Sequence, residues 1–157
     1  MSISVRRATE ADAPEMSRVL IASITELCSA AHHDDPAAIA AGPANKSVEG
    51  VLAMLAAPDS EIYVADRQGT IVAVGAIHAD MIELNYVDPQ HRRRGVSRAV
   101  MLRLEGVLRD RGVAVARLKS TETAHDFYKA LGWSDAGPAA RGRFIAAYPM
   151  RKALISR

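Results

Sequence analysis

Residues 84–98 read Leu-Asn-Tyr-Val-Asp-Pro-Gln-His-Arg-Arg-Arg-Gly-Val-Ser-Arg and carry the most structural information in this chain. They run from an apolar strand through an Asp-Pro turn into a basic loop, which opens onto an amphipathic helix. The first N–H groups of a helix lack partners within the helix and lie at the positive end of its dipole, so they bind anions. Three arginines beside a glycine, which lets the backbone approach a ligand closely, therefore predict a polyphosphate site.

The composition is typical of a soluble globular protein. The chain has 157 residues, of which 49% are hydrophobic and 24% charged, and this predicts one domain over residues 1–157. A formal net charge of +2 is too small to indicate nucleic-acid binding, so no nucleic-acid partner is expected. A single cysteine, Cys28, excludes an internal disulfide. Since no segment reaches the ~20 apolar residues of a membrane span and no apolar signal region begins the chain, we expect a cytoplasmic protein with no membrane partner.

Hydrophobic periodicity outlines the remaining elements. Alternating apolar and polar positions predict strands in residues 3–7, 61–66, 70–78, 81–87 and 113–119. The 3.6-residue spacing predicts helices whose inner faces lie in residues 16–27, 48–55, 96–111 and 124–131. Residues 31–46 predict a loop or broken helix, and residues 133–154 a final hairpin. The order β-α-α-β-β-β-α-β-α-β-β predicts an α/β (α+β) protein with one mixed, mostly antiparallel sheet and helices on both faces.

The strand in residues 81–87 has two chemically different faces. Strict alternation separates Met81, Glu83, Asn85 and Val87 from Ile82, Leu84 and Tyr86. The second set is more apolar and is the better core. The face with Glu83 and Asn85 is therefore expected to line a cleft.

Two motifs lie about thirty residues apart, with a helix and a strand between them. Residues 92–97, Arg-Arg-Arg-Gly-Val-Ser, follow Val-Asp-Pro at 87–89, and residues 124–133 read Ala-His-Asp-Phe-Tyr-Lys-Ala-Leu-Gly-Trp. They resemble the pyrophosphate loop (Arg/Gln-x-x-Gly-x-Gly/Ala) and the Ala-x-x-Phe-Tyr-x-x-x-Gly-aromatic segment of the GNAT superfamily of acyl-CoA-dependent N-acetyltransferases. The order of elements from residue 3 to 154 also matches. The resemblance covers nearly the whole chain and implies the GNAT fold.

The resemblance implies that acetyl-CoA is the acyl donor. The coenzyme A diphosphate would be bound by the loop and helix start, namely Arg92, Arg93, Arg94, Gly95, Val96, Ser97 and Arg98. The pantetheine arm would pair with Asn85, Tyr86 and Val87, where the family's strand splays from its neighbour, here residues 113–119. Thr121 stands where many members carry an asparagine that contacts the cofactor. The alternative for residues 92–98 is a solvated basic turn before an ordinary helix.

Tyr128 and Glu83 are the candidate acid and base. Tyr128 matches the general acid that protonates the departing thiolate in this family, and its alternative role is a core aromatic. Glu83 is the best-placed carboxylate to deprotonate an amine, directly or through water, and the alternative is an ion-paired strand residue. Asn85 would orient the acceptor or satisfy backbone groups at a bulge. His32 would contact the acceptor, and its alternative is a polar surface loop.

The favoured function is transfer of an acetyl group from acetyl-CoA to a primary amine by direct attack in a ternary complex. The expected acceptor is a small amine or an amino-acid-like molecule, and no metal is expected because the adjacent residues 32–35 cannot all converge on one ion. The alternatives are a non-catalytic acyl-CoA-binding sensor and a protein N-terminus or lysine acetyltransferase. Ala116 stands where ribosomal-protein N-terminal-alanine acetyltransferases place a glutamate, which weighs against that subfamily. Homodimers are common in the family, so a homodimer is a partner to test for.

Overall fold

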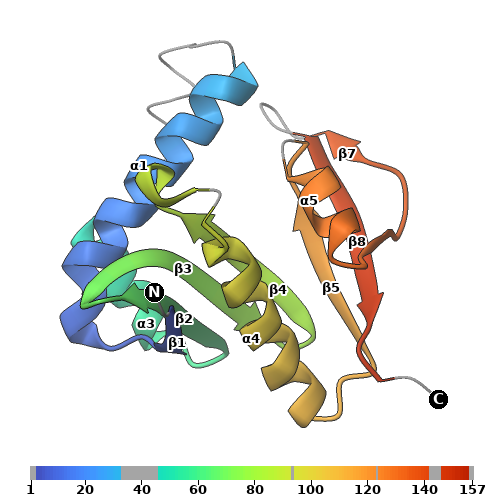
Figure 1. The fold of residues 1–157 in the computed structure, drawn as a ribbon, viewed down its shortest axis with the longest axis horizontal. Helices are drawn as coiled ribbons and strands as arrows, with labels where there is room; N and C mark the ends of the chain where they lie inside the picture. The colour runs from blue at the N-terminus through green and yellow to red at the C-terminus, as the bar shows by residue number, and fades with distance from the viewer. Residues whose placement is uncertain (1–2, 33–45, 93, 123, 142–145, 156–157) are drawn as a thin grey trace.

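A mixed β-sheet with helices on both faces forms the centre of the molecule (Figure 1). The computed structural model describes residues 3–32, 46–92, 94–122, 124–141 and 146–155. Within these residues the strands follow the order β1-β2-β3-β4-β5-β8-β6, and β7 pairs with β8 off this path. All neighbouring strands are antiparallel except β4 and β5, which are parallel. This confirms the predicted mixed, mostly antiparallel sheet.

The strands are β1 (Ser4–Arg7), β2 (Ser60–Arg67), β3 (Thr70–His78), β4 (Met81–Val87), β5 (Val115–Ser120), β6 (Ser134–Asp135), β7 (Ala140–Arg141) and β8 (Ala146–Ala153). The helices are α1 (Ala13–His32), α3 (Val48–Ala56), α4 (Val96–Asp110) and α5 (His125–Ala130), with short 3-10 turns η1 (Glu10–Asp12) and η2 (Pro89–His91). None of the described helices is long and apolar enough to cross a membrane.

The predicted element order is confirmed, with two differences, one in residues 133–154 and one at the C-terminal end of α1. Residues 133–154 form three strands instead of one hairpin, because Gly137 (φ 155°) turns the chain and Pro138 has no N–H to continue a ladder. Helix α1 continues through His32 into the segment expected to be a loop. The alanines at 30 and 31 favour this extension, and most of that segment lies outside the described residues.

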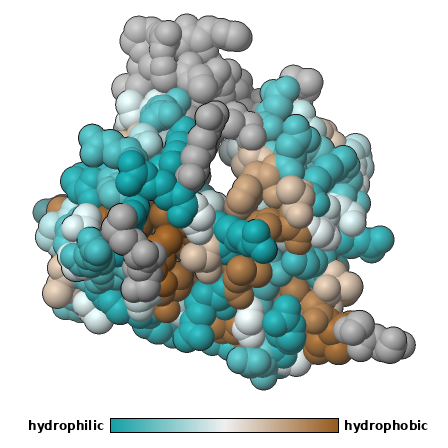
Figure 2. Space-filling view, in the orientation of Figure 1, coloured by the Kyte–Doolittle hydropathy of each residue, from teal (hydrophilic) through white to brown (hydrophobic). Residues whose placement is uncertain are grey.

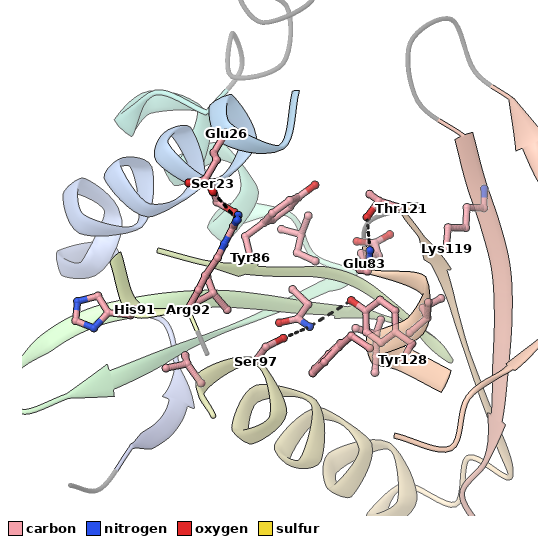
Figure 3. A pocket seen from close by; sticks show the side chains of 18 residues that line it. Ser23, Glu26, Glu83, Tyr86, His91, Arg92, Ser97, Lys119, Thr121 and Tyr128 are labelled. Atoms are coloured by element: carbon pink, nitrogen blue, oxygen red, sulfur yellow. Dashed lines mark hydrogen bonds and ion pairs between the residues drawn. The ribbon is translucent and has the colours of Figure 1, made fainter. Parts of the chain in front are cut away.

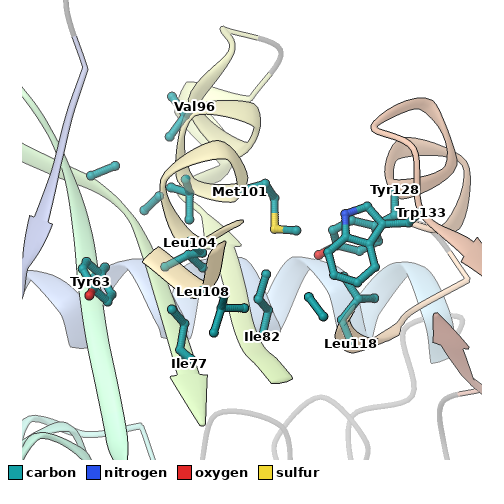
Figure 4. Close-up of a cluster of buried hydrophobic side chains, with 14 of the residues drawn as sticks. Tyr63, Ile77, Ile82, Val96, Met101, Leu104, Leu108, Leu118, Tyr128 and Trp133 are labelled. Atoms are coloured by element: carbon teal, nitrogen blue, oxygen red, sulfur yellow. The ribbon is translucent and has the colours of Figure 1, made fainter. Parts of the chain in front are cut away.

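Two hydrophobic cores hold the helices to the sheet. On one face, α1 and α3 bury Met16, Leu20 and Val51 completely against β2 and β3. On the other face, the predicted stripe of α4 is confirmed, with Leu104 and Leu108 fully buried (Figure 4). Full burial of each such side chain contributes about 1.5–3 kcal/mol. Strand β3 contacts both cores, which explains why seven of its nine residues are buried.

Helix α4 lies unusually close to β3 at Gly75. A Cβ atom at this position would lie 2.9 Å from Val100 Cγ1 and 3.1 Å from Leu104 Cδ1. Glycine is therefore required at position 75 by the close approach of α4, and not by a left-handed φ. The contact sets the height of α4 above the sheet, and with it the position of the loop that precedes the helix.

The sheet opens between β4 and β5. The two strands pair at Met81–Arg117 and Ile82–Leu118, and no further pair joins their described residues. Strand β4 nevertheless continues to Val87 and β5 to Ser120. The backbone of residues 83–87 on this side therefore faces an opening instead of a partner strand, as the resemblance implied.

The predicted division of β4 into two faces is wrong at Ile82, whereas Leu84 and Tyr86 share one face and Asn85 and Val87 the other, as predicted. Ala76 pairs with Leu84 but its neighbour Ile77 pairs with Ile82, so a β-bulge leaves Glu83 without a register partner. The bulge changes which side each residue faces. Ile82 joins the core under α4, whereas Leu84 packs against the core under α1. Asn85 points toward α4 and α5, on the side of Ile82, for the same reason.

A buried ion pair ties α4 to the C-terminal strands. Glu105 of α4 is 1% exposed and accepts hydrogen bonds from Lys152 Nζ (2.7 Å) and Trp133 Nε1 (3.2 Å). Lys152 Nζ also donates to the carbonyl of Leu131 at 2.6 Å. Because β4 and β5 share only two residue pairs among the described strands, this polar cluster is a second connection across the opened sheet.

Candidate active site

A cavity of about 490 Å³ occupies the opening between β4 and β5 (Figure 3). Its walls come from α1, β4, the loop before α4, the end of β5 and the start of α5. The space-filling view shows the molecule hollowed between the side of α1 and the side of α5 and β8 (Figure 2). Nine of the residues singled out from the sequence line this cavity: Glu83, Asn85, Tyr86, Val87, Arg92, Val96, Ser97, Thr121 and Tyr128.

Three of the remaining candidates do not line the cavity, and two fall outside what the structure describes. Arg94, Gly95 and Arg98 are exposed near the start of α4, outside its walls. Arg93 lies outside the described residues. His32 is the last residue of α1, and its side chain also lies outside what the structure describes, so its contact with an acceptor stays a prediction.

The start of α4 has the geometry of an anion site. Gly95 is the N-cap residue with φ 79°, a left-handed conformation that favours glycine, and its cap carries no side-chain hydrogen bond. The first N–H groups of the helix are thus left for a ligand. Arg92 lies at the cavity wall, where its Nη1 donates to Glu26 Oε1 of α1 at 2.6 Å. An arriving diphosphate would compete with Glu26 for this guanidinium.

A second arginine fixes the turn between β4 and the loop. Arg18 of α1 donates to Asp88 Oδ2 (2.7 Å) and to the carbonyl of Ile71 (3.1 Å). Asp88 is 3% exposed and its Oδ1 accepts from the Gln90 N–H, capping η2. Burial alone would raise the pKa of Asp88, but the hydrogen bonds from Arg18 and Gln90 hold it below its ordinary value. The Val-Asp-Pro motif thus has a structural role that sequence reasoning did not assign.

Asn85 joins three elements inside the cavity. Its Nδ2 donates to Ser97 Oγ of α4 at 2.8 Å and to Tyr128 Oη of α5 at 3.2 Å (Figure 3). Its Oδ1 is buried and has no hydrogen-bond partner among the described residues. A buried acceptor without a donor costs about 1–3 kcal/mol. The amide nitrogen, and not this oxygen, therefore holds the two hydroxyl groups of the cavity wall.

Tyr128 is held firmly and keeps its proton. The residue is 8% exposed, and its ring makes edge contacts with Phe127 and Trp133 at centroid distances of 5.2 and 6.4 Å. Burial raises the pKa of the Tyr128 hydroxyl, the hydrogen bond from Asn85 lowers it in part, and Tyr86 adds to the rise. The net rise keeps Tyr128 neutral and able to donate at physiological pH. Its core and cavity roles coexist, since the ring packs while the hydroxyl reaches Asn85.

Glu83 and Lys119 lie at the open side of the cavity. Continuing the parallel register by one residue from Ile82–Leu118 brings Glu83 of β4 opposite Lys119 of β5. Both line the cavity, and neither makes a side-chain hydrogen bond or ion pair within the part of the chain that the structure describes. The alternative reading of Glu83 as an ion-paired strand residue therefore finds no partner among the described residues.

Sequence reasoning missed five polar residues in or beside this site: Arg18, Ser23, Glu26, His91 and Lys119. Lys119 carried a readable signal, because it follows Leu118 at the end of a strand expected to splay from β4. The three residues of α1 carried none that is specific. Which turn of α1 faces the loop before α4 depends on packing between segments some seventy residues apart. No group of three or more acidic, histidine or cysteine side chains suited to a metal ion occurs among the described residues.

Comparison with known proteins places this geometry in one family. Residues 17–154 match the family described as the acetyltransferase (GNAT) domain. A sequence search of curated proteins finds no match.

Similar solved structures share the fold. A GCN5-related N-acetyltransferase from Rhodopseudomonas palustris has a TM-score of 0.83 at 20% identity, over 98% of this chain and 96% of that one. The PaiA N-acetyltransferase from Thermoplasma acidophilum, in complex with coenzyme A, has a TM-score of 0.81 at 17% identity, over 98% and 99%. The ribosomal-protein-S18-alanine N-acetyltransferase from Escherichia coli has a TM-score of 0.71 at 18% identity, over 99% and 96%. With 138 of its 157 residues inside the family match (17 to 154), the chain belongs to the GNAT acetyltransferase family.

Proposed function

We propose that this protein transfers an acetyl group from acetyl-CoA to the primary amine of a small, amino-acid-like acceptor, by direct attack in a ternary complex. The observation that carries the proposal is the cavity in the opened sheet, which has an anion site at one end and the Tyr128 hydroxyl in its wall. Family membership supports acetyl transfer in general. The donor, the acceptor and the residue roles rest on the chemistry of the cavity.

The cavity suits the diphosphate and the pantetheine arm of acetyl-CoA. Arg92, Ser97 and the first N–H groups of α4 would bind the diphosphate. The β4 backbone at residues 85–87, which has no strand partner on the side of β5, would bind the amides of the pantetheine arm. The structure of the PaiA enzyme contains coenzyme A, which supports the same ligand for this fold.

The reaction needs one proton removed and one supplied. The neutral acceptor amine attacks the thioester carbonyl carbon, the C–N bond forms, and the C–S bond breaks with its electron pair leaving on sulfur. Tyr128 gives its proton to that sulfur and is reprotonated from solvent. Glu83 takes the excess proton from the amine nitrogen, directly or through water. A backbone N–H of β4 would polarise the carbonyl, as in an oxyanion hole.

The unpaired charges at the open side of the cavity favour an acceptor with both an amine and an acidic group. Glu83 would attract the amine, while Lys119 would bind a carboxylate on the same molecule. Positive charge continues away from Lys119, because Arg117 and Arg151 are exposed register partners on β5 and β8. Asp80 balances part of this charge, since its Oδ2 lies 3.5 Å from Arg117 Nε, and an anionic acceptor would add to that balance.

A thiol-release assay tests the proposal. Acetyl-CoA is supplied with amino acids, with the same compounds lacking the carboxylate, and with peptides bearing free N-termini or lysines. We expect turnover with amino acids, a loss of about 10²-fold or more in kcat for Tyr128→Phe and a smaller loss for Glu83→Gln. Lys119→Met should raise the KM of amino acids and leave that of decarboxylated amines unchanged. Lys129→Met, which alters a lysine outside the cavity, is the matched control.

Three results would contradict parts of the proposal. Unchanged rates for both Tyr128→Phe and Glu83→Gln would remove the catalytic assignment. A preference for peptides would identify a protein acceptor instead. Tight binding of acetyl-CoA without thiol release for any acceptor would identify a non-catalytic sensor.

A further inference from the structure

The hydrogen bonds of Asn85 link the two ends of the proposed cofactor site. Ser97 lies in the first turn of α4, beside the anion site, and Tyr128 lies on α5, at the place where the thioester would react. Asn85 contacts both hydroxyls from the β4 strand between them (Figure 3). In the sequence, Ser97 lies 12 positions and Tyr128 lies 43 positions after Asn85.

The direction of the hydrogen bonds determines what each hydroxyl can still do. An asparagine amide has two N–H donors, and both are used here, one for Ser97 Oγ and one for Tyr128 Oη. Each hydroxyl accepts a hydrogen bond and keeps its own proton for another partner. If Asn85 accepted instead, both protons would be directed at its carbonyl oxygen and away from a ligand.

The oxygen of Asn85 has no partner within the described part of the chain in this orientation of the amide. Oδ1 is buried and has no donor among the described residues, although turning the amide over would bring that atom toward two hydroxyl groups. An amide held in the orientation that leaves its own acceptor unsatisfied serves the groups to which it donates. Both of those groups line the cavity.

We propose that Asn85 is a positioning residue for acetyl transfer, which holds Ser97 and Tyr128 as acceptors so that each keeps a proton for the cofactor. The inference rests on the proposed function, because it needs Tyr128 to be the acid. As the C–S bond breaks and the electron pair moves to sulfur, the Tyr128 proton is already free to follow. Ser97 directs its proton to a phosphate oxygen. Asn85 itself neither gains nor loses a proton.

A spectroscopic test needs no acceptor. The chain has four tyrosines, so labelling their ring Cζ atoms with ¹³C gives few NMR signals, and the Tyr128 signal is the one missing in Tyr128→Phe. The hydrogen bond from Asn85 lowers the pKa of Tyr128, so Asn85→Ala should raise the titration midpoint of that signal further. Ser120→Ala, which removes another buried hydroxyl close to the cavity, is the control and should leave the midpoint unchanged. An unchanged midpoint in Asn85→Ala would overturn the proposal.

A kinetic test uses Asn85→Asp, which keeps the shape but can only accept. The carboxylate would draw the protons of both hydroxyls to itself, so kcat should fall by roughly tenfold or more. Ser97→Ala should instead raise the KM for acetyl-CoA and leave kcat within about twofold. Because Asn85 acts through Tyr128, the double variant Asn85→Asp/Tyr128→Phe should be no slower than Tyr128→Phe alone.

The outcomes separate this inference from the function on which it rests. A slow Tyr128→Phe with a fast Asn85→Asp would sink the role of Asn85 and leave the acetyltransferase assignment intact. A double variant slowed by the product of the two single effects would do the same. Full activity of Tyr128→Phe would remove both ideas. Thermal unfolding and coenzyme A binding of each variant establish that the altered proteins are folded.

Discussion

Replacing Lys152 with methionine tests whether the buried ion pair holds the two halves of the opened sheet together. The side chains of Glu105 and Lys152 are 2% and 22% exposed, and their charged atoms are 2.7 Å apart. Methionine has a similar length, so it preserves most of the packing of the lysine stem. Glu105 would be left with a single neutral donor, Trp133 Nε1, and the carbonyl of Leu131 would lose its charged donor.

The expected cost is large. Removing one partner of a buried ion pair typically costs about 3–5 kcal/mol, because the other charge stays buried without compensation. For a chain of this length, a loss of 1 kcal/mol lowers Tm by about 2–4 °C, so Tm should fall by about 6–20 °C. Urea unfolding, monitored by circular dichroism, should show a lower midpoint concentration of urea and little change in the dependence of the unfolding free energy on urea.

Two companion variants make the result specific. Lys129→Met removes a half-exposed lysine that lies 3.4 Å from Asp135, and it should leave Tm almost unchanged, because exposed ion pairs contribute little to stability. Glu105→Leu/Lys152→Met should recover most of the loss, because hydrophobic pairs replace buried ion pairs well. About 1 kcal/mol should remain, since Trp133 Nε1 would keep no acceptor. A Lys152→Met protein as stable as Lys129→Met would refute the reasoning.

Three further predictions follow from the packing and charges. Gly75→Ala should lower the free energy of unfolding by about 1–3 kcal/mol and weaken coenzyme A binding, because the added Cβ would force α4 away from β3. The control Gly106→Ala, with no atom within 4 Å of its Cβ, should raise the free energy of unfolding by about 0.5–1 kcal/mol. Calorimetry on both variants measures these changes, and equal effects would contradict the close contact at Gly75. Glu26→Gln should tighten coenzyme A binding by about 1.5- to 5-fold in titration calorimetry. The reason is that the exposed ion pair with Arg92, which contributes about 0.2–1 kcal/mol, no longer competes with the diphosphate for the guanidinium. Weaker binding by Glu26→Gln would count against this competition. Hydrogen bonds from Arg6 lower the pKa of Asp12 to about 2, so the pair stabilises the fold above the unfolded pKa of about 3.9, and this stabilisation is lost as pH falls through about 2. Arg6→Met should therefore lower the free energy of unfolding by about 1–2 kcal/mol at pH 7 and by less at pH 2.5. A stability difference between the two proteins that stays constant with pH would exclude this link between Asp12 protonation and folding.

The sequence predicted the framework of the fold because its signals are local. The stripe of α4 and the strand bounds of β3 and β4 follow from hydrophobic periodicity within a few residues. The predicted splay of β4 from β5 is confirmed by their short pairing, although that expectation came from the family resemblance. The location of the cavity follows from these elements.

Long-range packing accounts for what the sequence did not predict. The bulge at Glu83 reflects the register of two whole strands, and one extra residue is enough to reverse the face assigned to Ile82. Glu105 is a charged residue on the buried side of α4, which signals a buried partner, but neither Lys152 nor Trp133 could be named from spacing. Likewise, the bonds from Asn85 to Ser97 and Tyr128 depend on where two helices start relative to one strand.

The short pairing of β4 with β5 also has a consequence for aggregation and cooperativity. An unpaired strand edge normally invites another chain to add to it. Here the open edge of β4 lies inside the molecule and faces β5 across the cavity. A strand of another protein would collide with the far wall of the cavity, whereas a slender ligand with amide groups would fit. Such a ligand would act as a missing strand. Its binding should couple the unfolding of the N-terminal and C-terminal halves more tightly, because it would add to the two β4–β5 residue pairs, the core under α4 and the Glu105–Lys152 pair that already join them.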